Sequence, residues 1–337
     1  MLVTGGAGYV GAVLVPELLA RGYAVRVIDW YIFGRNVLAD APHQNHLEEI
    51  EGDIRDHALL RDALRDCDAV IHLACISNDP SFELNPQLSR SINFDAFQPL
   101  VRYAKEAGAQ RFIYASTSSV YGVSDAPSVT EDHPLLPITD YNKYKGLCEP
   151  ILLREQCDTF APVVIRPATI CGYSPRQRLD LTVNILTNHA VNRGRITVFG
   201  GAQMRPNIHI RDITDLYVQL LQLPPSVITG RVFNAGYQNR TVADIARIVR
   251  DTVRGELPGN NELEIVCEPS DDIRSYHICS DRIRQTIGFT PQRTIEDAVR
   301  DLVHAFAAGK LPDPMSDDRY YNIRTMKNLQ QAHAAVA

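Results

Sequence analysis

The 337-residue sequence has little of what marks secreted, membrane-spanning or metal-stapled proteins. Its seven cysteines are scattered, odd in number and form no CxxC pair, so neither a disulfide framework nor a zinc site is expected. No apolar run approaches the roughly 18 residues that span a membrane, and no basic segment with a cleavage site stands at the N-terminus. We therefore expect a cytoplasmic protein with no membrane partner and no bound metal.

An excess of positive charge is also missing. Lys and Arg number 34 against 40 Asp and Glu, which gives a formal net charge of -6. Sequence-independent binding of nucleic acid needs a basic face, so nucleic acid is not an expected partner, whereas a small anion held by a few arginines stays compatible. Hydrophobic residues make up 45% of the chain and can form a sizeable core without disulfides or metals, in one large domain or two smaller ones.

The first 170 residues alternate short β-branched segments with longer amphipathic ones. The expected strands are Met1–Thr4, Ala24–Asp29, Glu48–Ile54, Ala69–Cys75, Arg111–Ser116 and Pro162–Pro167. The expected helices between them are Val10–Arg21, His57–Asp66, Pro86–Ala107 and Tyr141–Cys157. Such alternation predicts right-handed βαβ units and hence an α/β fold, with a doubly wound parallel sheet covered by helices on both faces.

After Arg166 this rhythm changes, because Pro, Gly and Arg become dense over Arg166–Arg178. The elements expected next are helix Thr182–Asn192, strand Arg195–Phe199, loop Gly200–Pro206, helix Ile213–Leu221, strand Arg231–Ala235, helix Thr241–Arg254 and helix Ile295–Ala308. The tail from Asp313 is polar and is predicted to be a loop. We expect residues 1–170 to form the first domain, and residues 171–337 mainly a smaller mixed α/β cap with segments that return to it.

A glycine pattern follows the first strand and opens the first helix. Gly5, Gly8 and Gly11 form G-x-x-G-x-x-G, where glycines allow a sharp turn and the approach of a diphosphate to the positive helix N-terminus. Asp29 ends the second strand 18 residues beyond Gly11. A carboxylate there can accept hydrogen bonds from both adenosine ribose hydroxyls and repels a 2′-phosphate, so NAD is favoured over NADP. Arg35 lies near enough in sequence to keep some use of NADP open.

The third strand ends in Gly52-Asp53-Ile54, which has two interpretations. Asp53 can bind the adenine amino group while Ile54 packs on the ring. It can equally be the N-cap of the helix expected from His57.

Two side chains suited to proton transfer lie four residues apart on an expected helix. Tyr141 and Lys145 share one helix face, and an ammonium beside a phenol lowers its pKa, so Tyr141 can exchange a proton with a hydroxyl. A Tyr and a Lys at this spacing are, by themselves, more often surface residues without a catalytic role. Here, however, the strand Arg111–Ser116 runs into a stretch of hydroxyl residues, Ser116–Ser119, at the sheet edge where open α/β folds bind ligands.

At this point the sequence resembles the extended short-chain dehydrogenases/reductases, in particular their NAD-dependent nucleotide-sugar epimerases and dehydratases. The motifs that carry the resemblance are TGGAGYVG (4–11), Asp29, GDI (52–54), HLA (72–74), ASTSSVYG (115–122), YNKYK (141–145), RPATICG (166–172) and RPNIHIRD (205–212). They imply a Rossmann-type NAD domain with a substrate-binding cap, and a nucleotide-diphosphate sugar as substrate.

The resemblance also implies roles for single residues. Tyr141 is the expected acid/base, Lys145 its partner and a ligand of the nicotinamide ribose, and Thr117 binds the same sugar oxygen. Arg205 matches a cap residue that contacts the substrate diphosphate, for which an arginine fork is well suited. The expected cofactor residues are Gly5, Gly8, Tyr9, Val10, Gly11, Asp29, Asp53, Ile54, Leu73, Ala74, Asn93, Tyr141, Lys145, Pro167, Thr169 and Ile170. The expected substrate residues are Ser77, Asn78, Thr117, Arg176, Arg178, Asn184, Arg205 and Arg274.

Several of these substrate residues have a plainer reading. Ser77 and Asn78 can form a turn before Pro80. Arg176, Arg178 and Arg274 can each form a surface salt bridge.

The two residues after Thr117 bear on the reaction. In the family, 4,6-dehydratases carry Asp-Glu there, glucuronate decarboxylases carry Glu at the second position and 3,5-epimerases carry Cys, whereas this chain has Ser118 and Ser119. A serine hydroxyl replaces a carboxyl acid or a thiolate base poorly. The leading hypothesis is therefore a 4-epimerase, which needs only removal and return of hydride. A 4-ketoreductase or dehydrogenase is the alternative, and a cofactor-binding protein without turnover is a third.

Members of the family commonly dimerise through two helices of each subunit. The corresponding helices here are Pro86–Ala107 and Tyr141–Cys157, so the resemblance implies a homodimer.

Overall fold

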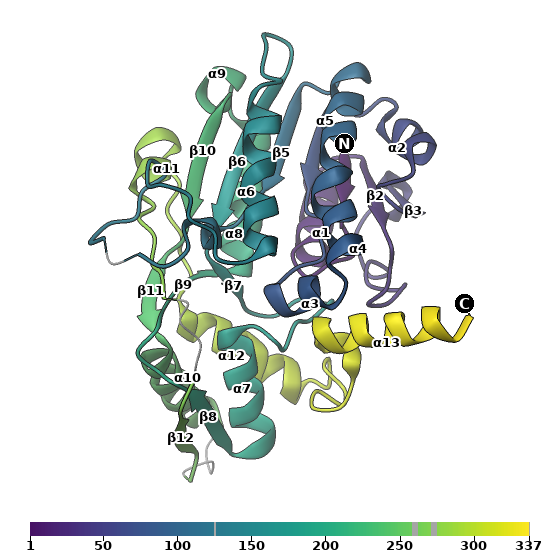
Figure 1. Cartoon of the computed structure of the whole chain (residues 1–337). Helices are drawn as coiled ribbons and strands as arrows, with labels where there is room; N and C mark the ends of the chain where they lie inside the picture. The colour runs from purple at the N-terminus through teal and green to yellow at the C-terminus, as the bar shows by residue number, and fades with distance from the viewer. Residues whose placement is uncertain (125, 258–261, 271–274, 337) are drawn as a thin grey trace.

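A seven-stranded parallel sheet forms the centre of the molecule (Figure 1). The computed structural model describes residues 1–124, 126–257, 262–270 and 275–336. The strand order is β10-β6-β5-β4-β1-β2-β3, and every neighbouring pair is parallel. The strands are β1 (Leu2–Thr4), β2 (Val25–Asp29), β3 (Leu47–Glu51), β4 (Ala69–His72), β5 (Arg111–Ala115), β6 (Ala161–Pro167) and β10 (Arg231–Ala235). The prediction of a doubly wound parallel sheet is confirmed.

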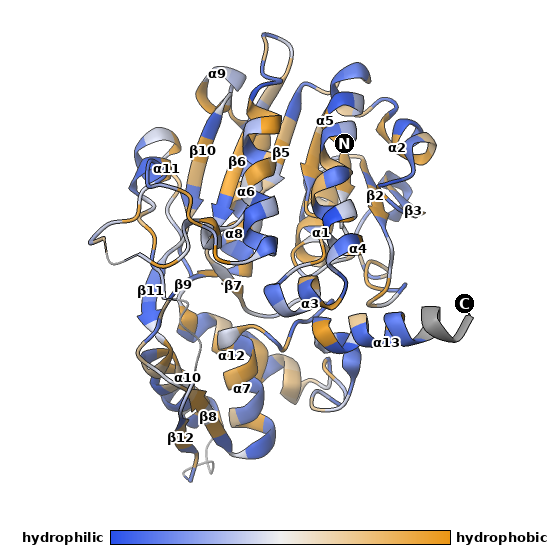
Figure 2. Cartoon of the chain, viewed as in Figure 1, coloured by the Kyte–Doolittle hydropathy of each residue, from blue (hydrophilic) through white to orange (hydrophobic). Residues whose placement is uncertain are grey.

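Two hydrophobic cores cover the two faces of this sheet, because successive strand residues point in opposite directions. In β5, Ile113 belongs to the core that contains Leu14 of α1, whereas Phe112 belongs to the core that contains Leu100 of α5. The covering helices are α1 (Gly11–Ala20), α2 (His57–Leu64), α5 (Phe97–Glu106), α6 (Asp140–Leu153) and α8 (Ile210–Gln222). Figure 2 shows the apolar strands of the sheet enclosed by these helices. Each fully buried Leu or Phe contributes about 1.5–3 kcal/mol.

The second half of the chain forms a smaller body beyond the carboxyl ends of the strands, and also returns β10 and α8 to the main sheet (Figure 1). Its strands form a three-stranded sheet in the order β11-β9-β7 and a parallel pair of β12 and β8. Helices α7, α10 and α12 pack around a core that includes Val183, Ile196, Val249 and Val299. These elements are β7 (Thr169–Cys171), α7 (Thr182–Arg193), β8 (Arg195–Phe199), β9 (Met204–His209), β11 (Gln238–Thr241), α10 (Val242–Glu256), β12 (Glu264–Glu268) and α12 (Ile295–Ala307).

Three sequence predictions about local structure are wrong. The segment Gly200–Pro206, expected to be a loop, contains the start of strand β9 at Met204. The helix expected over Pro86–Ala107 is interrupted by a π-helical turn, η2 (Ser91–Asp95), which side-chain periodicity alone does not indicate. The tail from Asp313, expected to be a loop, forms α13 (Asn322–Val336), which runs beneath α3 (Asp79–Leu84) in Figure 1. The remaining short elements are η1 (Gln44–His46), α4 (Pro86–Arg90), η3 (Ser118–Tyr121), α9 (Pro225–Ile228), α11 (Asp281–Ile287) and η4 (Asp318–Tyr320).

Among the described helices, none combines the length and the apolar character needed to cross a membrane.

Candidate active site

A cavity of about 530 Å³ lies where the carboxyl edge of the main sheet faces the second half of the chain. Its sheet side is formed by residues at or directly after the ends of strands β1, β2, β3, β4, β5 and β6, together with α6. Its other side is formed by the segment after β7, by Arg205 of β9, by Tyr276 and by the start of α13. The carboxyl edge of an open parallel sheet is the usual ligand site of this fold class.

The glycine loop has the close backbone packing that its pattern requires. Gly5 has φ +73°, and a Cβ on it would lie 2.6 Å from the nitrogen of Ala74. A Cβ on Gly11 would lie 2.4 Å from the carbonyl oxygen of Gly6. Gly5, Gly8 and Gly11 all line the cavity at the N-terminus of α1. Backbone can therefore approach a diphosphate here without an intervening side chain, so the loop fits the dinucleotide NAD.

Asp29 presents its carboxylate to the same cavity from the end of β2. Its Oδ2 accepts a hydrogen bond from the nitrogen of Ala7 (3.0 Å) and its Oδ1 one from the nitrogen of Tyr31 (2.9 Å). Burial raises the pKa of Asp29, against the opposing effect of these hydrogen bonds. Arg35, whose nearness in sequence left the use of NADP possible, is exposed, pairs with Glu51 and does not line the cavity.

The two residues predicted to bind adenine, Asp53 and Ile54, lie at the cavity, and the alternative role of Asp53 as a helix N-cap is excluded. Asp53 and Ile54 line the cavity, and the Asp53 Oδ2 pairs with Nη2 of Arg55 at 2.6 Å. The N-cap of α2 is Asp56, whose side chain accepts from the nitrogens of Ala58 and Leu59. The interpretation of Asp53 as the helix cap is therefore wrong. Further predicted cofactor residues that line the cavity are Tyr9, Val10, Leu73, Ala74, Pro167, Thr169 and Ile170.

Two predicted ligand residues are placed behind the cavity wall. The Asn93 side chain accepts from the nitrogen of Ile76 (2.8 Å) and donates to its carbonyl (2.9 Å), so it clamps that loop. The fully buried Asn184 side chain bonds the nitrogen of Gly172 (3.0 Å), the hydroxyl of Tyr9 (3.0 Å) and the carbonyl of Arg178 (2.9 Å). Neither asparagine lines the cavity, because these backbone partners already use their amides.

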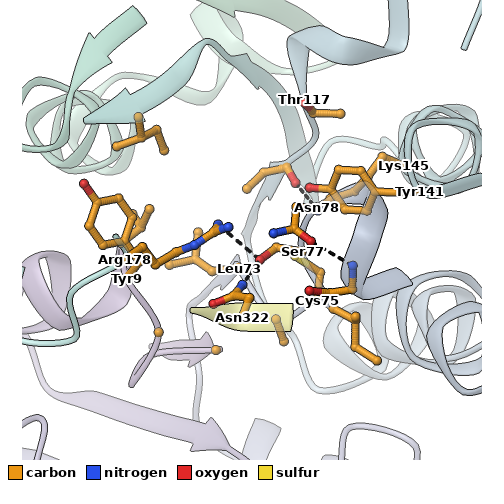
Figure 3. Close-up of a pocket in the computed structure, with 18 of the residues that line it drawn as sticks. Tyr9, Leu73, Cys75, Ser77, Asn78, Thr117, Tyr141, Lys145, Arg178 and Asn322 are labelled. Atoms are coloured by element: carbon orange, nitrogen blue, oxygen red, sulfur yellow. Dashed lines mark hydrogen bonds between the residues drawn. The ribbon is translucent and has the colours of Figure 1, made fainter. Parts of the chain in front are cut away.

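Thr117, Tyr141 and Lys145 come together on the sheet side of the cavity (Figure 3). Thr139 caps α6 by accepting from the nitrogen of Asn142, and the helix places Tyr141 and Lys145 one turn apart. The Lys145 Nζ, which is buried, donates to the carbonyl of Ala115 at the end of β5 (2.5 Å).

The electrostatics of Tyr141 differ from the sequence interpretation. Burial raises the pKa of the Tyr141 phenol well above its ordinary value, and the nearby Cys75 and Asp79 add to this effect. The positive charge that opposes the rise is Arg178 of the cap side, rather than Lys145 as predicted. The reason is geometric, since the Lys145 ammonium is directed at a backbone carbonyl.

The two serines after Thr117 differ in their position relative to the cavity. Ser118 is buried and does not line the cavity, whereas Ser119 does. The Ser119 Oγ donates to the hydroxyl of Tyr276 (3.0 Å), and the Tyr276 ring lies 5.8 Å from the guanidinium of Arg205. The cavity therefore has a serine–tyrosine contact at the position where some relatives of the family carry an acid.

Ser77 and Asn78 belong to a polar network beside Tyr141. Asn78 has φ +73°, and its side chain caps α3 by accepting from the nitrogen of Ser81 (3.0 Å), as the turn interpretation predicts. The Arg178 Nη1 donates to the Oγ of Ser77 (3.3 Å), a contact visible in Figure 3. Both residues also line the cavity, so the turn and the ligand role are compatible.

The predicted arginines are not surface residues where the structure describes them. Arg176 is 4% exposed and Arg178 9%, and both line the cavity, so the surface salt-bridge alternative is wrong for these two. The Arg178 Nε bonds the Oδ1 of Asp180 at 2.9 Å. Arg205 lines the cavity and donates to the carbonyl of Met204 (2.9 Å). The prediction for Arg274 lies outside the described residues.

Sequence reasoning missed Tyr276, Asn322 and Met326, which all line the cavity. For Asn322 and Met326 the sequence contains a pattern that indicates a helix. Ile323, Met326 and Leu329 recur at three-residue spacing, which is consistent with one helix face. Within the described ranges, no group of three or more His, Cys, Asp or Glu side chains is arranged to hold a metal ion.

Comparison with known proteins gives the family. A model of the NAD dependent epimerase/dehydratase family matches residues 1–236. UDP-glucose 4-epimerase of Lactobacillus helveticus is 28% identical over 271 residues, covering 74% of this chain and 81% of that protein. UDP-glucuronic acid decarboxylase 1 of Xenopus tropicalis is 25% identical over 320 residues, covering 91% of this chain and 72% of that protein.

A solved structure agrees with these matches. MoeE5 in complex with UDP-glucuronic acid and NAD is similar with a TM-score of 0.77 and 25% identity, covering 91% of this chain and 99% of MoeE5. The names of these relatives point to different reactions on nucleotide sugars. The family match spans 236 of the 337 residues and includes the glycine loop, Thr117, Tyr141 and Lys145. The chain is thus an enzyme of the NAD-dependent epimerase/dehydratase family.

Proposed function

We propose that this enzyme epimerises a nucleotide-diphosphate sugar at C4. The observation that carries the proposal is a cavity with Thr117, Tyr141 and Lys145 on its sheet side and Ser119, bonded to Tyr276, in place of a carboxyl or thiol group. Dehydration and decarboxylation need further acid/base groups beyond those that handle a hydroxyl proton, whereas epimerisation at C4 does not.

The side chains have the following roles in the proposed reaction. The Tyr141 oxygen removes the proton of the C4 hydroxyl, which the Thr117 hydroxyl orients. Arg178 supplies positive charge that favours the phenolate, and Lys145, whose Nζ is held by the carbonyl of Ala115, serves the nicotinamide ribose. NAD, held by the glycine loop and Asp29, would supply a reversible hydride acceptor for C4. The 4-keto sugar then turns in the cavity, and Tyr141 finally returns the proton.

The test is NMR of products after incubation of the purified enzyme with UDP- and dTDP-sugars, together with absorbance at the NADH band. We expect the C4 epimer and no net change in NADH. A 4-keto-6-deoxy sugar, a decarboxylated sugar or stoichiometric NADH would each contradict the proposal. The last of these would favour the reductase alternative.

We also propose that the enzyme is a homodimer formed through α5 and α6, as the family resemblance implies. On α6, Leu147 is 42% exposed and Pro150 follows it on the outer surface. Light scattering should give twice the chain mass, and Leu147→Glu should give monomers. A monomeric wild-type enzyme would contradict this. A cytoplasmic location stays a prediction from the sequence.

A further inference from the structure

Arg176 is a buried cation with unsatisfied hydrogen-bond donors. Its Nη2 donates to the Oδ1 of Asn322 (2.6 Å), but its Nε and Nη1 are buried and have no hydrogen-bond partner among the described residues. No described carboxylate forms an ion pair with it either. A buried guanidinium in this state is costly, and an anion at the cavity would supply the missing acceptors. Burial beside Arg178 also lowers the pKa of Arg176 to about 9.

The surroundings of Arg176 place it at the dinucleotide end of the cavity. Its guanidinium carbon lies 3.5 Å from the ring centroid of Phe33, just beyond β2, and its charge acts on the carboxylate of Asp29. Its own segment is tied to the glycine loop, because the Ser174 Oγ donates to the carbonyl of Tyr9 (2.7 Å) and the Tyr9 hydroxyl to the carbonyl of Gly172 (2.7 Å).

Arg178 has more hydrogen-bond partners than Arg176 and acts on another part of the cavity, although its own Nη2 is also buried without a partner among the described residues. It uses Nε on Asp180 and Nη1 on Ser77, and its charge acts on Tyr141 at the reactive end. The two arginines therefore serve opposite ends of one cavity.

We propose that Arg176 binds the diphosphate of the dinucleotide from the side opposite the glycine loop, and that Asn322 of α13 positions its guanidinium. An arginine fork matches phosphate geometry, and two buried donors of Arg176 remain available for it. This assignment does not depend on which sugar carbon reacts.

The C-terminal helix is then part of the cofactor site. Asn322 is held there at its backbone nitrogen, which donates to the Oδ2 of Asp180 (3.0 Å), and at its Nδ2, which donates to the Oγ of Ser77 (2.8 Å). Met326, one turn further along, is 3% exposed and lines the cavity. The first turns of α13 therefore hold the guanidinium against the diphosphate.

The first experiment measures nucleotide binding rather than turnover. Nucleotide-free enzyme is titrated by calorimetry with ADP-ribose and adenosine, and in parallel with NADP and UDP. Arg176→Gln should weaken the affinity for ADP-ribose on the order of tenfold to a hundredfold and leave the affinity for adenosine unchanged, because only ADP-ribose carries the diphosphate. Arg35→Gln is the matched control, because Arg35 is exposed and pairs with Glu51 outside the cavity. It should bind ADP-ribose and adenosine like the wild type.

Other outcomes overturn the assignment. Equal losses for ADP-ribose and adenosine would mean that Arg176 only maintains the fold. A loss for NADP alone would mean that it reads a 2′-phosphate. A loss for UDP with ADP-ribose unchanged would mean that it binds the substrate diphosphate. These titrations contain no nucleotide-sugar substrate, so failure of the C4 epimerase proposal would not alter them.

The second experiment tests the positioning role of Asn322. Asn322→Asp should weaken the binding of ADP-ribose more than Asn322→Ala does, because the new carboxylate pairs with Arg176 and repels the diphosphate. Thermal unfolding followed by circular dichroism checks that both variants fold. Two folded variants with wild-type affinity, or with equal losses, would contradict the positioning role.

Discussion

Two walls enclose the cavity, and they are held in place differently. The sheet wall consists of the residues at or directly after the ends of strands β1, β2, β3, β4, β5 and β6, with Tyr141 and Lys145 of α6. The cap wall consists of residues 176–182, Arg205, Tyr276 and the start of α13. Local geometry positions the sheet wall, because each of its side chains sits at a strand end or on one helix turn. Hydrogen bonds between distant residues position the cap wall, such as Asn322 to Ser77 across 245 positions.

This difference separates chemistry from recognition. In the proposed reaction the sheet wall carries the groups that exchange the proton, on elements packed into the two cores of the sheet. The cap wall carries charged and hydrogen-bonding groups that lie outside the strands of the main sheet. Changes in the sheet wall should therefore abolish the reaction or destabilise the fold, whereas changes in the cap wall should tune pH dependence and affinity.

The largest effect is expected in the sheet wall. Tyr141→Phe removes the acid/base and should lower kcat by about 10²–10⁴-fold with the fold intact. Tyr144→Phe, on the same helix but packed on Phe82 and Phe94, is the control and should remain active. Initial rates by coupled assay and far-UV circular dichroism measure both. A Tyr141→Phe enzyme within tenfold of wild type would remove Tyr141 from the reaction.

A second effect of similar size concerns stability beneath the sheet wall. The Arg166 Nη2 and the Glu149 Oε2 lie 2.6 Å apart, with 6% and 4% of their side chains exposed. Glu149→Gln leaves a buried guanidinium without its counter-charge and should cost about 3–5 kcal/mol of unfolding free energy. Glu155→Gln, which breaks the exposed pair with Lys105, should cost little in the same urea titration. Equal losses would contradict this account of the core.

The cap wall should act on the pH dependence. Arg178 opposes the rise in the Tyr141 pKa, so Arg178→Gln should raise that pKa further. Because the phenolate is the form that removes the proton, less of it is then present at a given pH. The rising limb of the kcat–pH profile should accordingly move to higher pH. A profile that stays in place or moves to lower pH would show that Arg178 does not act on Tyr141.

The smallest effect is expected at Tyr276. Tyr276→Phe removes the hydroxyl that accepts a hydrogen bond from Ser119, a contact worth about 1 kcal/mol. Steady-state kinetics should show kcat/KM lower by roughly fivefold. A loss as large as that of Tyr141→Phe would assign Tyr276 to the chemistry itself and erase the distinction between the walls.

The same distinction explains how far the sequence predicts the molecule. The β1–glycine loop–α1 unit, Asp29 and the Tyr141/Lys145 pair follow from spacings of a few residues, so the sheet and its ligand edge were predictable. The family resemblance implies ligand roles for Asn93 and Asn184, but backbone groups that only the tertiary fold brings near form hydrogen bonds with their amides.

The cap wall shows where sequence reasoning stops. Arg176 is hydrogen-bonded to Asn322, which is 146 positions away and lies in a tail whose polar composition suggests a loop. The charge that acts on Tyr141 comes from Arg178, a residue on the far side of the cavity. Neither contact has a local pattern, since each joins elements that meet only in the folded chain.

The most direct test of C4 epimerisation follows the hydrogen at that carbon. The enzyme is incubated in ordinary water with a nucleotide sugar deuterated at C4, and the product is analysed by NMR and mass spectrometry. The account predicts the C4 epimer with its deuterium retained at C4, because the same hydride leaves and returns. Loss of deuterium to solvent, retention of the original configuration, or a product that has lost water or carbon dioxide would contradict it.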